Sequence, residues 1–240
     1  MERGRNELHM VKRLETAVGD RLISVIAYGP IAHEDEYFGG EHLLIVIADL
    51  EPDTLRRLGE PVSWWLAKGE PWPRLFSPEL LQTSIDVFPI EILDIAGHRR
   101  IVFGSDALAN VEVDPVYLRA QCERELREKL MRLREGYVEC HGTDSTQDLR
   151  ELLATSFAAF ARIFRGCLHL LGAPRARQDR DIVIALCARL DLPAEAFLEI
   201  ERLARGGRST DPEAAFIAYY EALAAAERRI DQLIIQGDQS

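Results

Sequence analysis

Residues 26–47 have the residue types and spacing that could do chemistry, because two apolar runs flank a polar connection that contains glycine. Gly29 follows the first run, and a helix beginning after it would offer backbone N–H groups and a favourable dipole to a phosphate. At the start of a strand, alternate residues point to the same face and can share a divalent ion. The segment therefore predicts a strand, a tight turn, a short helix and a second strand.

The elements that must position this segment alternate between helix and strand. Apolar residues at helical spacing predict a helix over residues 5–18. The runs 22–28 and 42–48 are short, rich in β-branched residues and apolar almost throughout, which favours central strands covered on both faces. Residues 52–68 are expected to form one or two helical pieces around Pro61.

Two further strands are predicted before the sequence pattern becomes all-helical. A short helical turn is expected after Pro78, and the segment TSIDVFPIEILDI, residues 83–95, follows as a strand that carries Asp86. In that strand Pro89 would mark an edge or an end, because proline lacks a backbone donor. The run RRIVF, residues 99–103, is expected as the last strand of the sheet.

From Val113 onwards the sequence has the pattern of an all-helical protein. Residues 115–137 carry one apolar stripe, and residues 147–171 are apolar around most of their circumference, which places the second of these helices in the middle of a bundle. Shorter helices near 178–190 and 193–205 precede a last long helix that begins after Asp211 and Pro212. The chain is therefore expected to be α+β, with an α/β domain over residues 1–110 and a bundle of about five helices over residues 113–236.

Gly29 is followed by a segment expected to be helical and then by a strand, LLIVI, that begins with polar residues. This order resembles the nucleotidyltransferase superfamily of the polymerase-beta type. The hallmark of that superfamily is Gly-Ser, a helix, and Asp-x-Asp leading into an apolar strand. The segments SIDVFPIEILDI and HRRIVFG, with the helical second half, are similar to kanamycin-nucleotidyltransferase-like proteins that have a helical C-terminal domain. The resemblance implies a mixed sheet flanked by helices, and in active relatives Mg²⁺ with a nucleoside triphosphate.

The motif positions depart from that family at the residues that matter for catalysis. Gly29 matches the glycine, but Pro30 replaces the serine, so that a backbone N–H and a hydroxyl are both lost. Gly40 and His42 stand where the two metal-binding aspartates are expected, and neither is the hard oxygen ligand that Mg²⁺ requires. Asp86 alone matches the third carboxylate of the family.

These departures favour a non-catalytic nucleotidyltransferase-fold protein that acts as a nucleotide- or anion-binding or regulatory module. Without a metal, the charge that develops in phosphoryl transfer has no compensation. The expected ligand-binding residues are Gly29, Pro30, Gly40, His42 and Asp86, with no metal bound. Trp64, Trp65 and Trp72 either pack in the core or stack a base.

Three alternatives remain at this point. The first is a divergent transferase that moves a nucleoside monophosphate from a triphosphate to a small molecule or protein. It would use Asp86 with Glu41 turned inward by a bulge, or ligands borrowed from the acidic and histidine residues His33, Glu34, Asp35 and Glu36. The second is a HEPN-like ribonuclease in the helical half, because Arg162 and His169 have the spacing of that signature, although Ile163 replaces its polar residue. The third is a structural homo-oligomer formed through the helical domain.

The bulk composition constrains the partners. A net charge of −11 and a pI near 5.1 oppose non-specific binding to nucleic acid. A basic stretch (Arg162, Arg165, His169, Arg175, Arg177 and Arg180) is either a solvated helix face or a site for an anion or RNA. Residues 152–171 are too interrupted by charge to span a membrane, and the N-terminus lacks the apolar core of a secretory signal, so the cytoplasm is expected.

The four cysteines are widely spaced, and no CxxC pair is present. We expect reduced and mostly buried thiols. A metal site built on Cys140 and His141 is the alternative.

Overall fold

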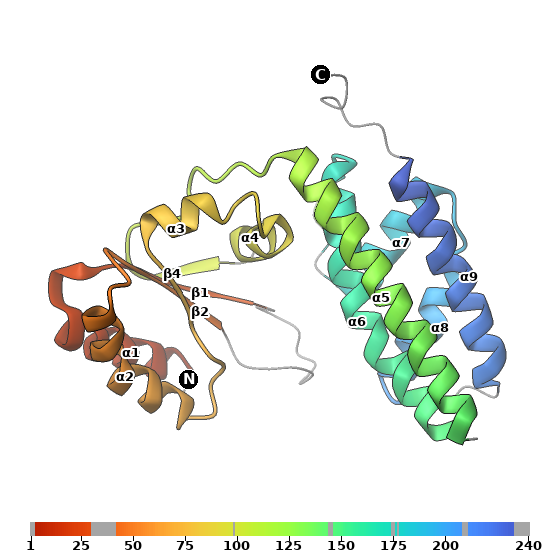
Figure 1. The fold of residues 1–240 in the computed structure, drawn as a ribbon, viewed down its shortest axis with the longest axis horizontal. Coiled ribbons are helices and arrows are strands. Elements are labelled where there is room, and N and C mark those ends of the chain that lie inside the picture. The colour runs from red at the N-terminus through yellow and green to blue at the C-terminus, as the bar shows by residue number, and fades with distance from the viewer. Residues whose placement is uncertain are drawn as a thin grey trace. The chain divides into compact units, whose positions relative to one another are not determined.

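The chain is α+β, as predicted. A computed structural model of the protein describes residues 3–29, 42–97, 99–143, 146–173, 176, 178–207 and 211–232. The chain divides into two compact units, Met1–Val113 and Asp114–Ser240. The first unit contains a sheet with helices, whereas the described part of the second contains helices alone (Figure 1).

A mixed four-stranded sheet forms the centre of the first unit, with the strand order β3-β2-β1-β4. The strands are β1 (Leu22–Tyr28), β2 (His42–Ile47), β3 (Arg74–Phe76) and β4 (Arg99–Gly104). Strand β1 is antiparallel to both β2 and β4, and β2 is parallel to β3. Tyr28 lies opposite His42, so the end of β1 and the start of β2 meet at one end of the sheet.

Helices cover both faces of the sheet, which explains why its two central strands are apolar almost throughout (Figure 1). On one face lie α1 (Arg3–Val18) and α2 (Pro52–Leu66), with the single 3₁₀ turn Gly19–Arg21 after α1. On the other lie α3 (Pro78–Thr83) and α4 (Pro89–Gly97). The first core contains the buried residues Met10, Leu14, Val25, Ala27, Leu43, Ile45, Ile47 and Trp65, and the second contains Ile26, Leu44, Val46, Leu81, Ile85, Ile92 and Ile95.

The strand predicted over residues 83–95 is wrong, because this segment forms the end of α3, a turn and α4. Ser77 caps α3 by accepting a hydrogen bond from the Leu80 N–H at 3.1 Å, and Pro78 takes the first helical position. Pro89 begins α4 in the same way and does not mark a strand edge. Leu81, Ile85, Ile92 and Ile95 pack against the sheet at helical spacing.

Two smaller points also concern the first unit. Of the one or two helical pieces expected around Pro61, the structure has one, because α2 continues through this buried residue. The short strand β3 lies in a segment for which the sequence predicts no strand. Its three residues pair with Leu44, Ile45 and Val46.

The second unit contains the helices α5 (Pro115–Thr143), α6 (Thr146–Leu170), α7 (Asp179–Leu190), α8 (Glu195–Ala204) and α9 (Pro212–Asp231). Helix α6 contacts the other four, as its apolar circumference predicts. Phe160, Phe164, Phe197 and Tyr219 form an edge-to-face aromatic core with ring centroids 5.5–6.0 Å apart. Asp211 caps α9 by accepting a hydrogen bond from the Ala214 N–H at 3.0 Å.

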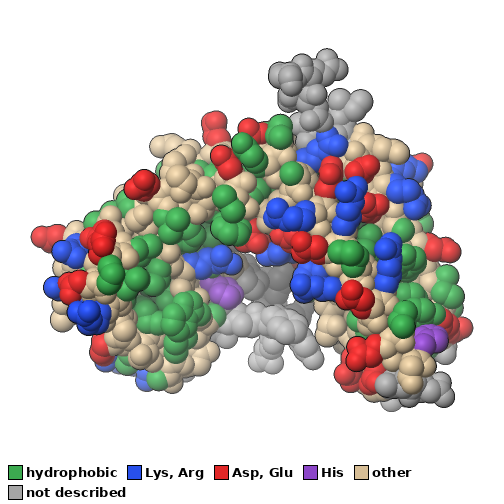
Figure 2. All heavy atoms as spheres, viewed as in Figure 1, with side chains coloured by type: hydrophobic (Ala, Val, Ile, Leu, Met, Phe, Trp, Pro, Cys, Tyr) green, Lys and Arg blue, Asp and Glu red, His purple; other side chains and the backbone are tan. Residues whose placement is uncertain are grey.

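The surface of the helical unit carries both signs of charge. Figure 2 shows acidic and basic side chains interspersed over α5 and α9, and Arg127 of α5 pairs with Glu227 and Asp231 of α9 at 2.7 and 2.6 Å. No helix in the described part of the chain has the length and apolar character needed to cross a bilayer.

The four cysteines are free and buried, as predicted. Burial raises the pKa of Cys187 to about 11, which keeps this thiol protonated and unreactive. No group of three or more potential metal ligands occurs within the described residues, and His141 lies instead against Tyr137 and Glu213.

Candidate functional site

The candidate site lies at the end of the sheet where β1 ends and β2 begins. Tyr28 is the last residue of β1 and lies opposite His42, the first residue of β2. Arg74 begins β3 opposite Leu44, and Arg99 begins β4 opposite Tyr28. Since directly paired residues share a face and side chains alternate along a strand, Tyr28, His42, Arg74 and Arg99 all belong to the face covered by α3 and α4.

The three residues on the neighbouring strands β1, β2 and β3 lie close to one another. The rings of Tyr28 and His42 stack with centroids 5.4 Å apart and an interplanar angle of 25°. Tyr28 is buried, His42 is partly buried and Arg74 is exposed. The Arg74 side chain lies close enough to the Tyr28 phenol to oppose part of the rise that burial causes in its pKa, so the guanidinium extends from the edge strand towards the end of β1.

Burial and the nearby guanidinium determine the charge of this cluster. Burial, followed by the positive charge of Arg74, lowers the pKa of His42, so the imidazole is neutral at pH 7. Burial raises the pKa of Tyr28, and Arg74 only partly opposes that effect, so the phenol is neutral as well. The cluster therefore presents two neutral hydrogen-bonding groups and one fixed positive charge.

The charge of Arg74 has no carboxylate counterpart within the described residues, whereas Arg99 is fully engaged. Asp106 accepts hydrogen bonds from Nε and Nη2 of Arg99 at 3.0 and 2.7 Å, and this contact lowers the pKa of Asp106. Arg99 thus links the start of β4 to Asp106 in the turn that follows this strand. Of these two arginines, Arg74 presents the exposed guanidinium that a ligand can pair with.

Gly29 has an unusual backbone conformation directly beside this cluster. Its φ of +127° is a conformation that residues with a side chain rarely adopt. A Cβ at this position would also lie 3.4 Å from Cδ2 of the His42 ring. Glycine is therefore required here for the chain to leave β1 next to the imidazole.

The structure brings together only some of the predicted site residues. Gly29 and His42 are adjacent, while Pro30, Gly40 and Glu41 lie outside the described residues, together with the segment 33–36. Asp86 is exposed in the turn between α3 and α4, so it does not lie on a strand beside β1 and β2 as the resemblance requires.

Sequence reasoning missed Arg74 and Tyr28. Tyr28 directly precedes Gly29, and its aromatic ring at the end of an apolar run was a usable signal. Arg74 had no such signal, because β3 is too short to have a recognisable alternation. Of the three tryptophans, Trp65 lies in the core, Trp64 is partly buried on α2, and Trp72 is 64% exposed.

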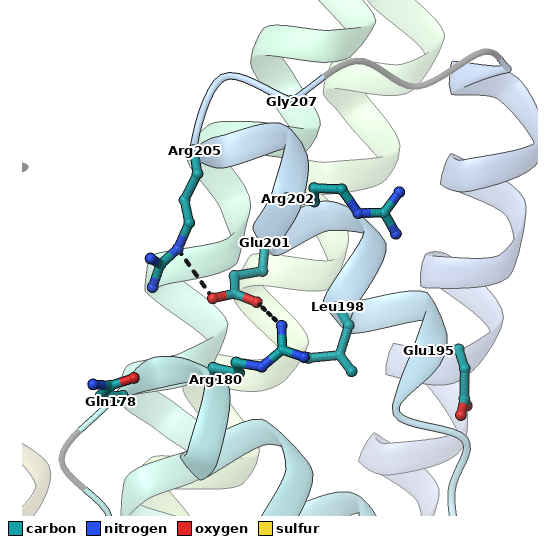
Figure 3. A pocket seen from close by; sticks show the side chains of 8 residues that line it. All are labelled: Gln178, Arg180, Glu195, Leu198, Glu201, Arg202, Arg205 and Gly207. Atoms are coloured by element: carbon teal, nitrogen blue, oxygen red, sulfur yellow. Dashed lines mark hydrogen bonds and ion pairs between the residues drawn. The ribbon is translucent and has the colours of Figure 1, made fainter.

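A second pocket, in the helical unit, has a volume of about 670 Å³ and involves α7, α8 and the residues after α8 (Figure 3). Arg180 and Arg205 both point to Glu201, whose side chain is only 6% exposed (Figure 3). Arg180 Nη1 lies 2.8 Å from one carboxylate oxygen, and Arg205 Nε lies 3.1 Å from the other. Arg202 pairs with Glu199 at 2.6 Å. The pocket is therefore built on ion pairs that satisfy one another.

The described arginines of the basic stretch are also ion-paired. Arg162 lies 2.8 Å from Glu125, and Arg165 lies 3.2 Å from Asp179. Arg175 and Arg177 fall outside the described residues. Arg162 and His169 both lie on α6, and the guanidinium of Arg162 is held by the carboxylate of Glu125 on α5.

Comparison of the sequence with protein-family models and with curated proteins finds no match.

Proposed function

We propose that the protein is a non-catalytic nucleotidyltransferase-fold module that binds an anionic ligand, such as the phosphates of a nucleotide, at the end of its sheet. The observation that carries the proposal is the exposed guanidinium of Arg74, which has no carboxylate partner within the described residues and lies beside the neutral side chains of Tyr28 and His42. Arginine binds phosphate oxygens through charge-assisted hydrogen bonds, and neutral imidazole and phenol groups can add further donors.

The position of Arg74 also argues against a conventional metal-dependent transferase. In the resemblance, the face of the sheet at His42 is where aspartates would gather around Mg²⁺. Arg74 places a positive charge on that face, and His42 supplies a neutral nitrogen in place of a carboxylate. Positive charge repels a divalent cation and attracts an anion, so the arrangement favours direct binding of phosphate.

The test is a thermal-unfolding experiment with ATP in the presence of EDTA and, separately, of excess Mg²⁺. A ligand that binds only the folded state stabilises it by about 1.4 kcal/mol at ten times its Kd. We expect ATP to raise the unfolding temperature in EDTA, with no further increase on adding Mg²⁺. Arg74→Gln should remove the effect, whereas Arg56→Gln, at another exposed arginine that lies on α2, should retain it.

The remaining functions give different outcomes in the same experiment. A stabilisation that requires Mg²⁺, with label transferred from a nucleoside triphosphate to an acceptor, would establish the divergent transferase in place of the binding module. The absence of any ATP effect under both conditions would overturn nucleotide binding and favour the structural oligomer.

A further inference from the structure

The groove between α1 and α2 contains a second set of positive charges that the sheet-end site does not use. Its volume is about 1,080 Å³. Arg5, Lys12 and Arg13 of α1, with Lys68 just after α2, line it against a single acidic residue, Glu60. This is an unusual excess in a protein whose net charge is −11.

Most of these cations lack an acidic partner. Arg13 contacts Glu60, but Arg5, Lys12 and Lys68 form no ion pair with any carboxylate among the described residues. A second acidic residue, Glu70, accepts a hydrogen bond from Asn6 at 3.1 Å. In contrast, the arginines of the helical unit described above are paired with acids. Three uncompensated cations in one groove form a surface that attracts negative charge.

Trp64 holds two of the cations in place. The Arg13 guanidinium lies 4.8 Å from the Trp64 ring centroid, and Lys68 Nζ lies 5.7 Å from it. His9 packs edge-on at 6.2 Å. Cation–π contacts fix the charged groups without neutralising them. The indole is therefore already engaged with protein cations, which disfavours its use for stacking a base.

We propose that the α1/α2 groove binds a short carboxylate-rich peptide segment of a partner protein. From Arg5 to Thr16 the lining residues follow α1 for about 16 Å, which suits a segment of a few residues. A long nucleic acid would extend past the groove over a surface whose average charge repels it, whereas a short acidic segment can lie within the groove.

The experiment is fluorescence anisotropy with the full chain and a labelled hexaglutamate peptide, compared with a hexaglutamine peptide and a U6 RNA. The groove variant combines Arg5→Gln, Lys12→Gln and Lys68→Gln. The matched control combines Arg56→Gln, Arg124→Gln and Arg132→Gln, which removes the same charge at three exposed positions outside the groove.

We expect hexaglutamate to bind more tightly than hexaglutamine, and added salt to weaken this binding. The groove variant should lose about tenfold in affinity and the control less than about twofold. Equal binding of the two peptides, or an equal loss in both variants, would overturn the proposal. Tighter binding of U6 than of hexaglutamate would replace the acidic peptide with a nucleic acid. The ATP response of Arg74 is a separate readout that the groove variant should leave intact.

Discussion

Arginine has opposite roles at the end of the sheet and in the α7/α8 pocket. Arg180 and Arg205 both contact the buried carboxylate of Glu201, so their charges are neutralised within the protein. Arg74 is exposed and lies near neutral Tyr28 and His42. A guanidinium already paired with a carboxylate contributes to structure, whereas one beside neutral groups retains the capacity to bind an anion.

The largest expected effect on stability concerns Arg180 and Arg205, the two arginines that are paired with a carboxylate. The double variant Arg180→Ala, Arg205→Ala leaves the Glu201 carboxylate buried without its two partners. We expect a loss of about 2 kcal/mol in the free energy of unfolding, below the cost of a fully buried pair because both arginines are half exposed. Urea unfolding measures the loss.

Arg202→Ala is the control for this variant, because Arg202 lines the same pocket but pairs with Glu199 on a more exposed surface. We expect it to change the unfolding free energy by less than about 0.5 kcal/mol. If the double variant were no less stable than this control, the distinction between a structural and a ligand-binding arginine would not hold.

Gly29→Ala tests whether the backbone beside His42 is specialised. At a φ of +127° an added methyl group should cost about 1–2 kcal/mol in unfolding free energy, with the His42 ring 3.4 Å away. Gly59→Ala, in the exposed interior of α2 with open space around it, should instead stabilise the protein by about 0.5–1 kcal/mol. Matching effects of the two substitutions in urea unfolding would refute the special role of Gly29.

The smallest effect is the pH dependence from His42. Because its pKa is lowered in the folded protein, the unfolded chain takes up a proton first as the pH falls below 6.5. Stability therefore decreases with falling pH until the folded pKa is passed, and the group has no effect well above 6.5. Arg74→Gln should raise the His42 pKa towards its ordinary value, as an NMR titration of the ring would measure. A His42 pKa that is unchanged in this variant would show that burial acts alone.

The sequence was a good guide wherever a long periodic pattern existed. The apolar runs of β1 and β2 and the stripes of α5, α6 and α9 are long enough to distinguish a strand covered on both faces from an amphipathic helix. Residues 83–95 were mistaken for a strand because Ile85, Val87 and Ile92 are β-branched. The caps at Ser77 and Pro89 and packing against the sheet favour helices instead.

The site was harder to predict than the fold. Gly29 and His42 could be placed together because they belong to the ends of two adjacent strands. Arg74 could not, because its proximity to His42 depends on the pairing of β3 with β2 across a long stretch of sequence. The position of Asp86 likewise depends on the tertiary packing of α3 and α4, which places this residue in a turn.

The shortness of β3 has a consequence for self-association. This edge strand has only three residues, and Pro73 and Pro78 lie close to its two ends. Proline cannot donate a backbone hydrogen bond, so another chain would find few groups there with which to extend the sheet. Growth of an intermolecular β-structure from this edge is therefore disfavoured, and contacts between copies at β3 would be made by side chains.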